Sequence, residues 1–273
     1  MFMYEKSIDM KNRHESLYDP KFYERQIEGS IRSAKVILAS LFKDWVPSSV
    51  IDFGCGHGGW LSVAHDLGSK KVVGLDGYWV SQDDLVDSEI EFVPVDFDKI
   101  IEVSERFELA MSMEVAEHLP YSKADSFVEA LCSSADVVLF SAAIVCQGGT
   151  NHINEQPQSY WVNKFSQLGY ECFDPFRSDI WDDERVEVWY RQNILLFISR
   201  SSNNVGLSEL KKKKPAIVDL VHPLLLKEKE VGWKEIVQNK NERIDQPSPK
   251  FILASIWKLI FRRWTIESNQ SKN

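Results

Sequence analysis

Short apolar runs alternate with longer mixed segments along most of the chain. Residues 20–43 place apolar side chains three and four positions apart, which predicts an amphipathic helix before the first run. Seven later runs have the length and β-branched content of buried strands: 48–53, 71–76, 90–96, 107–113, 135–143, 169–176 and 193–200. Helical segments are expected between the earlier strands, over 59–68, 78–87, 123–134 and 159–168.

This alternation predicts an α/β fold, a Rossmann-like, mostly parallel seven-stranded sheet with helices on both faces. Residues 178–190 are too polar at first and too β-prone later for a strong helix between the last two strands, so an antiparallel edge strand is expected. We divide the chain into a helical cap (1–47), the α/β domain (48–200), and a linker with a C-terminal helical extension (201–273).

The composition narrows the class of protein. A chain of 273 residues with 44% hydrophobic content can bury one sizeable core, and a net charge of -9 argues against nucleic acid as a partner. Four cysteines without a C-x-x-C pair, and a charged N-terminus, predict a cytoplasmic protein with free thiols. No apolar run is long enough to span a membrane.

The segment FILASIWKLIFRRW, residues 251–264, has a different character. Its polar residues form a narrow stripe, which is typical of a helix lying at a membrane surface. For a cytoplasmic protein, this surface would be the inner face of the membrane. Four lysines, Lys211 to Lys214, would add attraction to anionic lipid. Docking onto the domain and contact between two copies remain alternatives, and the sequence indicates no oligomeric state.

The stretch VIDFGCGHGGW, Val50 to Trp60, combines an apolar run with four glycines. It fits both the G-x-G-x-x-G loop of dinucleotide-binding folds and the D-x-G-x-G-x-G loop of S-adenosylmethionine (SAM) enzymes. Asp52 favours the second, because a carboxylate there suits the α-ammonium group of SAM better than a pyrophosphate. Asp76 ends the next strand and suits ribose hydroxyls in either case. Tyr160 and Lys164 form the Tyr-x-x-x-Lys pair of short-chain dehydrogenases. These enzymes also need a serine about thirteen residues before the tyrosine, where this chain has Gln147.

Four segments in order, VIDFGCGHGG, VVGLDG, FVPVDFDK and FELAMSMEVAEHLP, resemble the motifs of class I SAM-dependent methyltransferases. The resemblance implies SAM as cofactor, with its methionine part beside Asp52, Gly54 and Gly56, and its ribose on Asp76. It implies that Met113 and Glu114 border the sulfonium and the acceptor. The remaining expected cofactor residues are Cys55, Gly77, Asp96 and Phe97, the last two beside the adenine.

Residues 151–177 and 180–197 resemble the acceptor half of bacterial methyltransferases of capsule and O-antigen assembly. The resemblance implies a glycan acceptor. Amide and aromatic side chains near the expected sheet edge suit a carbohydrate, and the candidate substrate-binding residues are Asn154, Gln156, Trp161, Tyr190, Arg191 and Asn193.

A sugar hydroxyl must lose its proton, and a histidine titrates in the right range to accept it. His152, in a polar loop after the fifth strand, is one candidate. His118 is the second, and Glu114 would face it at i, i+4 if EVAEH is helical. A purely structural role remains open for both histidines. No tight cluster of metal ligands stands out, so no metal is expected.

These features predict an O-methyltransferase that acts on a hydroxyl of a bacterial surface-polysaccharide sugar. A small aromatic or quinone-like hydroxyl is an alternative acceptor. The alternative without catalysis is a SAM-binding scaffold in a glycan-assembly complex.

Overall fold

The computed structural model describes residues 20–99, 101–215 and 217–231. The chain divides into two units, residues 1–222 and 223–273. The first holds the sheet, and residues 223–231 of the second are helical. The apolar segment 251–264 lies outside the described residues, so the expectation of a membrane-surface helix stays a prediction. Within the described ranges, no helix is both long and apolar enough to cross a bilayer.

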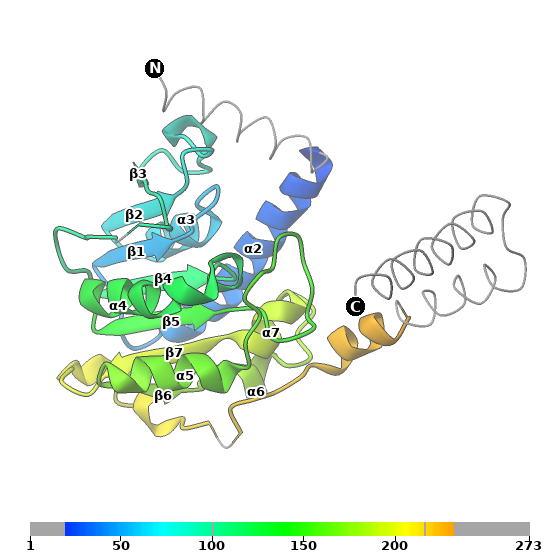
Figure 1. Cartoon of the computed structure of the whole chain (residues 1–273). Helices are drawn as coiled ribbons and strands as arrows, with labels where there is room; N and C mark the ends of the chain where they lie inside the picture. Colours follow the sequence, from blue (N-terminus) through cyan, green and yellow to red (C-terminus); the bar gives the residue numbers. More distant parts are fainter. Residues whose placement is uncertain (1–19, 100, 216, 232–273) are drawn as a thin grey trace, which may run out of the picture. The chain divides into compact units, whose positions relative to one another are not determined.

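A seven-stranded sheet forms the centre of the first unit, with the strand order β3-β2-β1-β4-β5-β7-β6 (Figure 1). The strands are β1 (Ser49–Phe53), β2 (Lys71–Asp76), β3 (Glu91–Pro94), β4 (Leu109–Met113), β5 (Val137–Ser141), β6 (Tyr170–Phe173) and β7 (Leu195–Ser199). Strands β1 to β5 all run parallel to one another, and β7 is antiparallel to both β5 and β6. The predicted Rossmann-like fold is confirmed, although β7 lies one position inside the edge.

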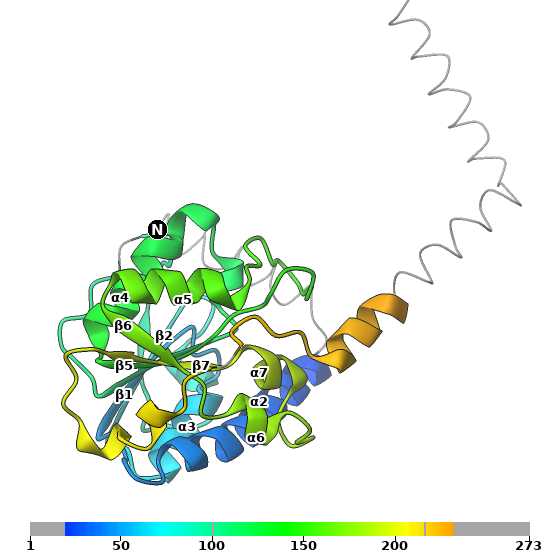
Figure 2. The same ribbon diagram turned by 90° about the horizontal axis from the view of Figure 1, so that it is seen from below.

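Helices cover both faces of the sheet (Figure 2). One face carries α4 (Ala124–Ser134) and α5 (Gln158–Gln167). The opposite face carries α2 (Pro20–Leu41), α3 (Gly59–Asp66), α6 (Arg177–Ile180) and α7 (Val188–Asn193). Because side chains alternate along a strand, neighbouring residues of β4 enter different cores: Met111 packs with the α2 and α3 side, and Ala110 with the α4 and α5 side.

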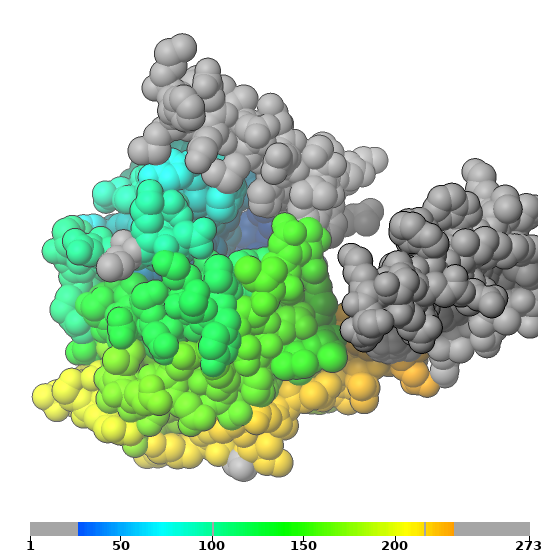
Figure 3. All heavy atoms as spheres, in the orientation of Figure 1, coloured from blue at the N-terminus to red at the C-terminus, as the bar shows by residue number. Residues whose placement is uncertain are grey.

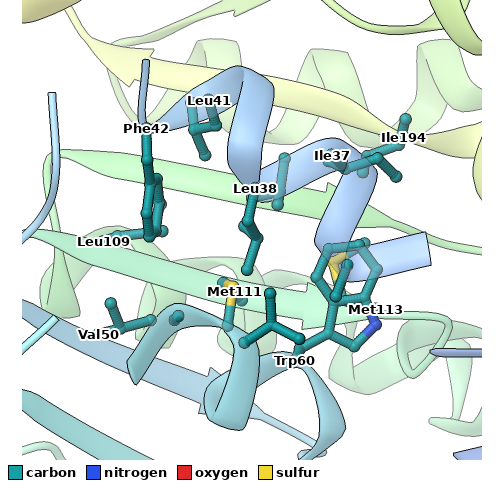
Figure 4. Close-up of a cluster of buried hydrophobic side chains, with 14 of the residues drawn as sticks. Ile37, Leu38, Leu41, Phe42, Val50, Trp60, Leu109, Met111, Met113 and Ile194 are labelled. Atoms are coloured by element: carbon teal, nitrogen blue, oxygen red, sulfur yellow. The ribbon is translucent and has the colours of Figure 1, made fainter. Parts of the chain in front are cut away.

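The core beneath α2 explains why this helix is part of the domain. Leu38 and Phe42 pack with Leu109 and Met111 of β4 and with Trp60 of α3 (Figure 4). Leu38, Leu109 and Met111 are 0% exposed. Each such side chain stabilises the fold by about 1.5–3 kcal/mol through burial. The helical cap is therefore packed onto the sheet, while the three domain boundaries stay predictions.

Two local predictions are wrong. Residues 78–87 do not form a helix, because Ser81 and Asp84 form a reciprocal cap around a single 3-10 turn, Gln82–Asp84, and Leu85 is extended. The connection from β6 to β7 contains α6 and α7, where little helix was expected. These short helices, of 4 and 6 residues, are held by burial of Ile180 and Tyr190 in the core rather than by intrinsic propensity.

Residues 217–222 return to the domain after the polar stretch that follows β7. The Arg177 guanidinium, 1% exposed, donates hydrogen bonds to the carbonyl oxygens of Ile217 and Val218 at 3.0 and 2.8 Å. The Gln158 side chain donates to the Leu220 carbonyl at 2.9 Å. The backbone amide of His222 donates to Gln192 Oε1 at 2.7 Å. We call residues 217–222 the return segment.

Candidate functional site

The carboxyl ends of the parallel strands β1, β2, β4 and β5 meet at one edge of the sheet, where open α/β sheets bind ligands. The start of antiparallel β7 reaches the same edge, because Leu195 pairs with Phe140 near the end of β5. The surface in Figure 3 is hollowed between the green loop that follows β5 and the cyan segment that follows β2.

The glycine loop after β1 turns tightly with three glycines in the left-handed region. Gly54, Gly56 and Gly58 have φ values of 84°, 53° and 79°. A Cβ on Gly54 would lie 2.4 Å from a methyl carbon of Val115, so this glycine is needed for close packing. A Cβ on Gly56 would meet no atom of the described residues within 4 Å. The loop is therefore packed at Gly54 and open at Gly56.

Two aspartates lie beside this loop. The backbone amides of Gly56 and Gly77 donate to the Asp76 carboxylate at 2.7 and 2.6 Å. Asp52 is 2% exposed, and its Oδ1 has no hydrogen-bond partner within the described part of the chain. Burial, together with the nearby Asp76, raises the pKa of Asp52 to about 7. A buried carboxylate oxygen without a partner fits a ligand that brings a positive charge, such as the α-ammonium group of SAM.

The other expected cofactor residues lie in different surroundings. The Cys55 side chain is buried against Gly74, where burial raises the pKa of its thiol. Asp96 forms an ion pair with Lys99 at 3.2 Å, and Phe97 packs edge-on against Phe127 with ring centroids 5.9 Å apart. Met113 is 7% exposed and belongs to the core beneath α2. Their roles stay predictions.

A second polar group forms around Glu114, directly after β4. Glu114 has a φ of 57°, and its amide donates to the Ser141 carbonyl oxygen at 3.0 Å. Its carboxylate accepts hydrogen bonds from Asn193 Nδ2 at 3.1 and 3.3 Å and from Gln147 Nε2 at 2.9 Å. Burial raises the pKa of Glu114, while these hydrogen bonds act in the opposite direction.

The expected helical pairing of Glu114 with His118 is wrong. Residues Ala116–His118 form a 3-10 turn, and Glu114 precedes it in the left-handed region. Instead, Glu117 turns inward, with 0% exposure. Burial, then the Glu114 carboxylate, raises the pKa of Glu117 well above its usual value, although the backbone amides of Glu117 and Ala143 lower it.

The two candidate histidines do come together. The rings of His118 and His152 meet edge-to-face with centroids 4.8 Å apart. His152 Nδ1 lies 3.1 Å from Glu155 Oε1, and Nε2 lies 4.0 Å from Glu117 Oε1. Backbone amides of Ile153 and Asn154 donate to the Glu117 carbonyl at 2.9 and 3.0 Å. These bonds attach the loop after β5 to the turn after β4.

The expected substrate-binding residues divide into two sets. Asn193 joins the polar group at Glu114, and Gln156 Nε2 donates to Asn154 Oδ1 at 3.0 Å beside His152. The others are packed elsewhere. The Trp161 indole is 2% exposed in the core beneath α4 and α5, the Tyr190 ring packs against Trp60, and Arg191 donates to the Trp181 carbonyl at 3.2 Å.

Sequence reasoning missed two members of the site, Glu117 and Gln147. Gln147 Oε1 accepts hydrogen bonds from Gln192 at 3.1 Å and Asn193 at 2.9 Å, so it links the loop after β5 to the start of β7. A signal for Glu117 was available in EVAEH, where a second acidic residue precedes the histidine. Nothing in the sequence marks Gln147, because the side chains that it contacts, Glu114, Gln192 and Asn193, lie 33 to 46 residues away.

This strand order, with a glycine loop after β1 and a carboxylate after β2, defines a class I SAM-dependent methyltransferase domain. A family model described as a methyltransferase domain matches residues 23–142, from α2 to the end of β5. The chain thus carries a SAM-dependent methyltransferase domain, and SAM is its cofactor.

Three similar solved structures are methyltransferases. The methyltransferase domain of bacterial CtHen1-C is 18% identical over 62% of this chain and 97% of its own, with a TM-score of 0.46. Magnesium protoporphyrin IX methyltransferase from Synechocystis PCC 6803 with bound SAH is 17% identical over 63% and 84%, with a TM-score of 0.46. Human N-acetylserotonin methyltransferase in complex with SAM is 15% identical over 61% and 51%, with a TM-score of 0.45. No curated protein matches the chain.

Proposed function

We propose that the chain transfers a methyl group from SAM to a hydroxyl of a sugar in a bacterial surface polysaccharide. The observation that carries the proposal is the polar group Glu114, Gln147 and Asn193 at the acceptor side of the sheet edge. Carboxylate and amide groups bind hydroxyls, whereas a small aromatic acceptor is better held by apolar walls.

The donor side would hold SAM through three features of this chain. Asp52 offers its unpartnered oxygen to the α-ammonium group, Gly56 leaves room beside the loop, and Asp76 supplies a carboxylate for the ribose hydroxyls. When bound, SAM supplies a methyl group on a positively charged sulfur, which is already activated for transfer. The protein's main task is therefore to position the acceptor oxygen in line.

On the acceptor side, we assign to His152 the role of accepting the hydroxyl proton. Glu155 lies 3.1 Å from His152 Nδ1, so a hydrogen on that nitrogen is held by the carboxylate. The proton-accepting lone pair then belongs to Nε2, which faces Glu117 and His118. A carboxylate behind an imidazole favours this tautomer and stabilises the imidazolium that forms.

Support for the sugar class comes from the second half of the chain. Residues 151–177 and 180–197 resemble the acceptor half of capsule and O-antigen methyltransferases, and these stretches include His152 and Asn193. The loop after β5 is polar over Asn154, Glu155 and Gln156. Such a loop suits a carbohydrate more than a quinone.

The test compares surface glycans of the producing cell with and without the gene by mass spectrometry. We expect each modified sugar to lose the mass of one CH₂ group on deletion. The wild-type gene and a His65→Ala gene should restore it, because His65 pairs with Asp87 at the surface. A His152→Ala gene should not. An unchanged glycan with an altered quinone pool would overturn the sugar assignment in favour of the aromatic acceptor.

A further inference from the structure

Glu117, His118 and His152 form a cluster of potential metal ligands. One ligand atom from each, a carboxylate oxygen and two imidazole nitrogens, lies within 4.8 Å of the others. Glu117 is buried, His152 is partly buried and His118 is exposed, so the cluster runs from the interior to the surface. A fully buried group has no opening for a substrate, whereas this one is open on the His118 side.

Among the described residues, the Glu117 carboxylate has no hydrogen-bonded partner that compensates its charge. Both oxygens are buried, and neither has a described donor in full hydrogen-bond geometry, although the nearby backbone amides of Glu117 and Ala143 lower the pKa of the carboxyl. A protonated His152, with Nε2 at 4.0 Å from Oε1, would supply an opposite charge. Buried carboxylates are normally paired or bound to a metal, because an isolated buried charge costs several kcal/mol. Glu117 therefore lies where a cation is needed.

The fold fixes this cluster rather than leaving it to chance. Glu117 and His118 lie on the turn after β4, and His152 comes from the loop after β5. The Glu117 carbonyl oxygen accepts hydrogen bonds from the backbone amides of Ile153 and Asn154, next to His152. Gly149 borders the His152 ring so closely that a Cβ on it would lie 2.3 Å from Nε2. Two segments some 30 residues apart are thus held with their ligand atoms converging.

Glu155 supplies the partner that a metal-bound histidine usually has. Histidines that bind metals through one ring nitrogen commonly donate a hydrogen bond from the other to a carboxylate. Here Glu155 Oε1 lies 3.1 Å from His152 Nδ1, which leaves Nε2 directed toward Glu117 and His118. The backbone amides of Cys146 and Gly148 in turn donate to Glu155 at 2.8 and 2.5 Å.

We propose that Glu117, His118 and His152 bind one divalent transition-metal cation at the acceptor side of the methyltransferase site. Two imidazoles and one carboxylate with open positions suit Mn²⁺, Fe²⁺, Co²⁺ or Zn²⁺ better than Ca²⁺. The chemistry that such a cation supplies is Lewis-acid polarisation of an oxygen ligand. Its role in catalysis rests on the proposed function, whereas its binding does not. With a cation present, His152 acts as a ligand and is no longer the proton acceptor.

Metal binding is measured on the full chain after treatment with a chelator and its removal. Titration with Zn²⁺ and with Mn²⁺, each followed by calorimetry, should give one equivalent bound per chain, and Mg²⁺ should bind more weakly. Co²⁺ should give visible absorption bands that depend on both histidines. Glu117→Gln and His152→Asn should each weaken binding by at least 100-fold. Glu155→Gln should weaken it by about 10–100-fold, the range measured for partners of metal ligands.

Two controls separate loss of the site from loss of folding. His65→Asn removes a surface histidine that also lies beside a carboxylate, Asp87, at 2.7 Å, and should bind the metal like the wild type. Glu117→Gln should unfold at the same or a higher temperature than the wild type without metal, because it removes a buried charge. Metal should raise the unfolding temperature of the wild type and leave that of Glu117→Gln unchanged.

The outcomes distinguish this proposal from the proposed function. Wild-type protein that binds no equivalent of Zn²⁺, Mn²⁺ or Co²⁺, or a Glu117→Gln variant that binds them equally well, would overturn the metal site. If the chelated protein still methylates the glycan at full rate, the proposed function stands and the cation has no part in it. One equivalent bound with an unchanged glycan in the deletion strain would support the metal site and overturn the sugar assignment.

Discussion

Asn193 Nδ2 lies 3.1 and 3.3 Å from the two carboxylate oxygens of Glu114, although 79 residues separate them in the chain. Glu114 follows β4, and Asn193 is the last residue of α7, two residues before β7 begins at Leu195. The antiparallel direction of β7 brings its first residues to the edge where the parallel strands end. The amide of Asn193 thus compensates a carboxylate that the sheet has already buried.

Replacing Asn193 with Ala should destabilise the protein, because the buried Glu114 carboxylate loses a hydrogen-bond donor. A hydrogen bond to a charged partner contributes about 1.5–3 kcal/mol, so the free energy of unfolding should fall by that amount. Asn193→Asp should cost more, because a second carboxylate would face Glu114. Urea denaturation measures both, with Asn163→Ala on the exposed face of α5 as the control. Equal stabilities for Asn193→Ala and Asn163→Ala would refute the role given to Asn193.

The glycine loop allows a paired test. Gly56→Ala places a Cβ in open space, so it should cost only the strain of a non-glycine residue in the left-handed backbone region, about 1–2 kcal/mol of stability. Its affinity for S-adenosylhomocysteine should fall at least tenfold. Gly54→Ala adds a collision with Val115, so its free energy of unfolding should fall by about 1–3 kcal/mol more than that of Gly56→Ala. A second substitution, Val115→Ala, should recover part of this loss. Calorimetry and thermal unfolding separate the two effects. Unimpaired donor binding by Gly56→Ala would show that the open side is not the donor site.

Stability should depend on pH through Asp52. Its pKa is raised from 3.8 to about 7 in the folded protein. Between pH 4 and pH 7 the unfolded chain has released this proton while the folded protein keeps it, so the free energy of unfolding decreases as pH rises. The total decrease is on the order of 4 kcal/mol and is complete above about pH 7.

Asp52→Asn has no proton to release at this position and should lack that decrease. The variant and the wild type should be similarly stable near pH 4, and the variant should be more stable at pH 8. Urea denaturation across this pH range gives both curves. Parallel curves for the two proteins would contradict the raised pKa of Asp52.

His152→Ala should separate donor binding from turnover. Affinity for S-adenosylhomocysteine should stay near the wild-type value, because the proposed function assigns His152 to the acceptor and not to the donor. Methyl transfer should fall by about 10²–10⁴-fold, the usual contribution of a positioned base. A loss is expected whether His152 accepts the proton or binds the proposed cation. Turnover by His152→Ala equal to that of His65→Ala would remove His152 from the reaction.

Trp161 offers a test of core packing against sugar stacking. Its ring lies 5.3 Å from the Phe140 ring, in a cluster that α4 and α5 cover. Trp161→Ala should lose about 3–5 kcal/mol of stability, as for other large buried aromatic residues. Trp161→Phe should keep most of the stability and leave the KM for the acceptor unchanged. A rise in that KM without a loss of stability would return Trp161 to the substrate site.

The sequence predicted the parts of this molecule that depend on local pattern. All seven strands, α2 and the glycine loop follow from runs of apolar residues and from glycine spacing, and Asp52 and Asp76 follow from their places at strand ends. The helix expected over 78–87 failed because the Ser81 and Asp84 cap ends after one turn. Local pattern also could not show that β7 inserts between β5 and β6.

The acceptor side was predictable only in part. His118 and His152 were found because polar residues followed strands, and Asn193 because it stands just before the last strand, but the contacts at the site join segments that are far apart in the chain. Glu117 was overlooked because its inward direction depends on the left-handed backbone at Glu114, which a non-glycine residue rarely adopts. Trp161 and Tyr190 were assigned to a ligand, whereas their burial is set by α5 and α7 packing on the sheet.

The return segment has a consequence for where the polypeptide can be shortened. A chain cut after Arg200 would retain every strand, yet the Arg177 guanidinium would lose two carbonyl partners, and Gln158 and Gln192 would each lose one. Gln192 also donates to Gln147, so the truncation would loosen the polar group around Glu114. The smallest autonomous piece of this enzyme therefore extends to His222, well past its last strand.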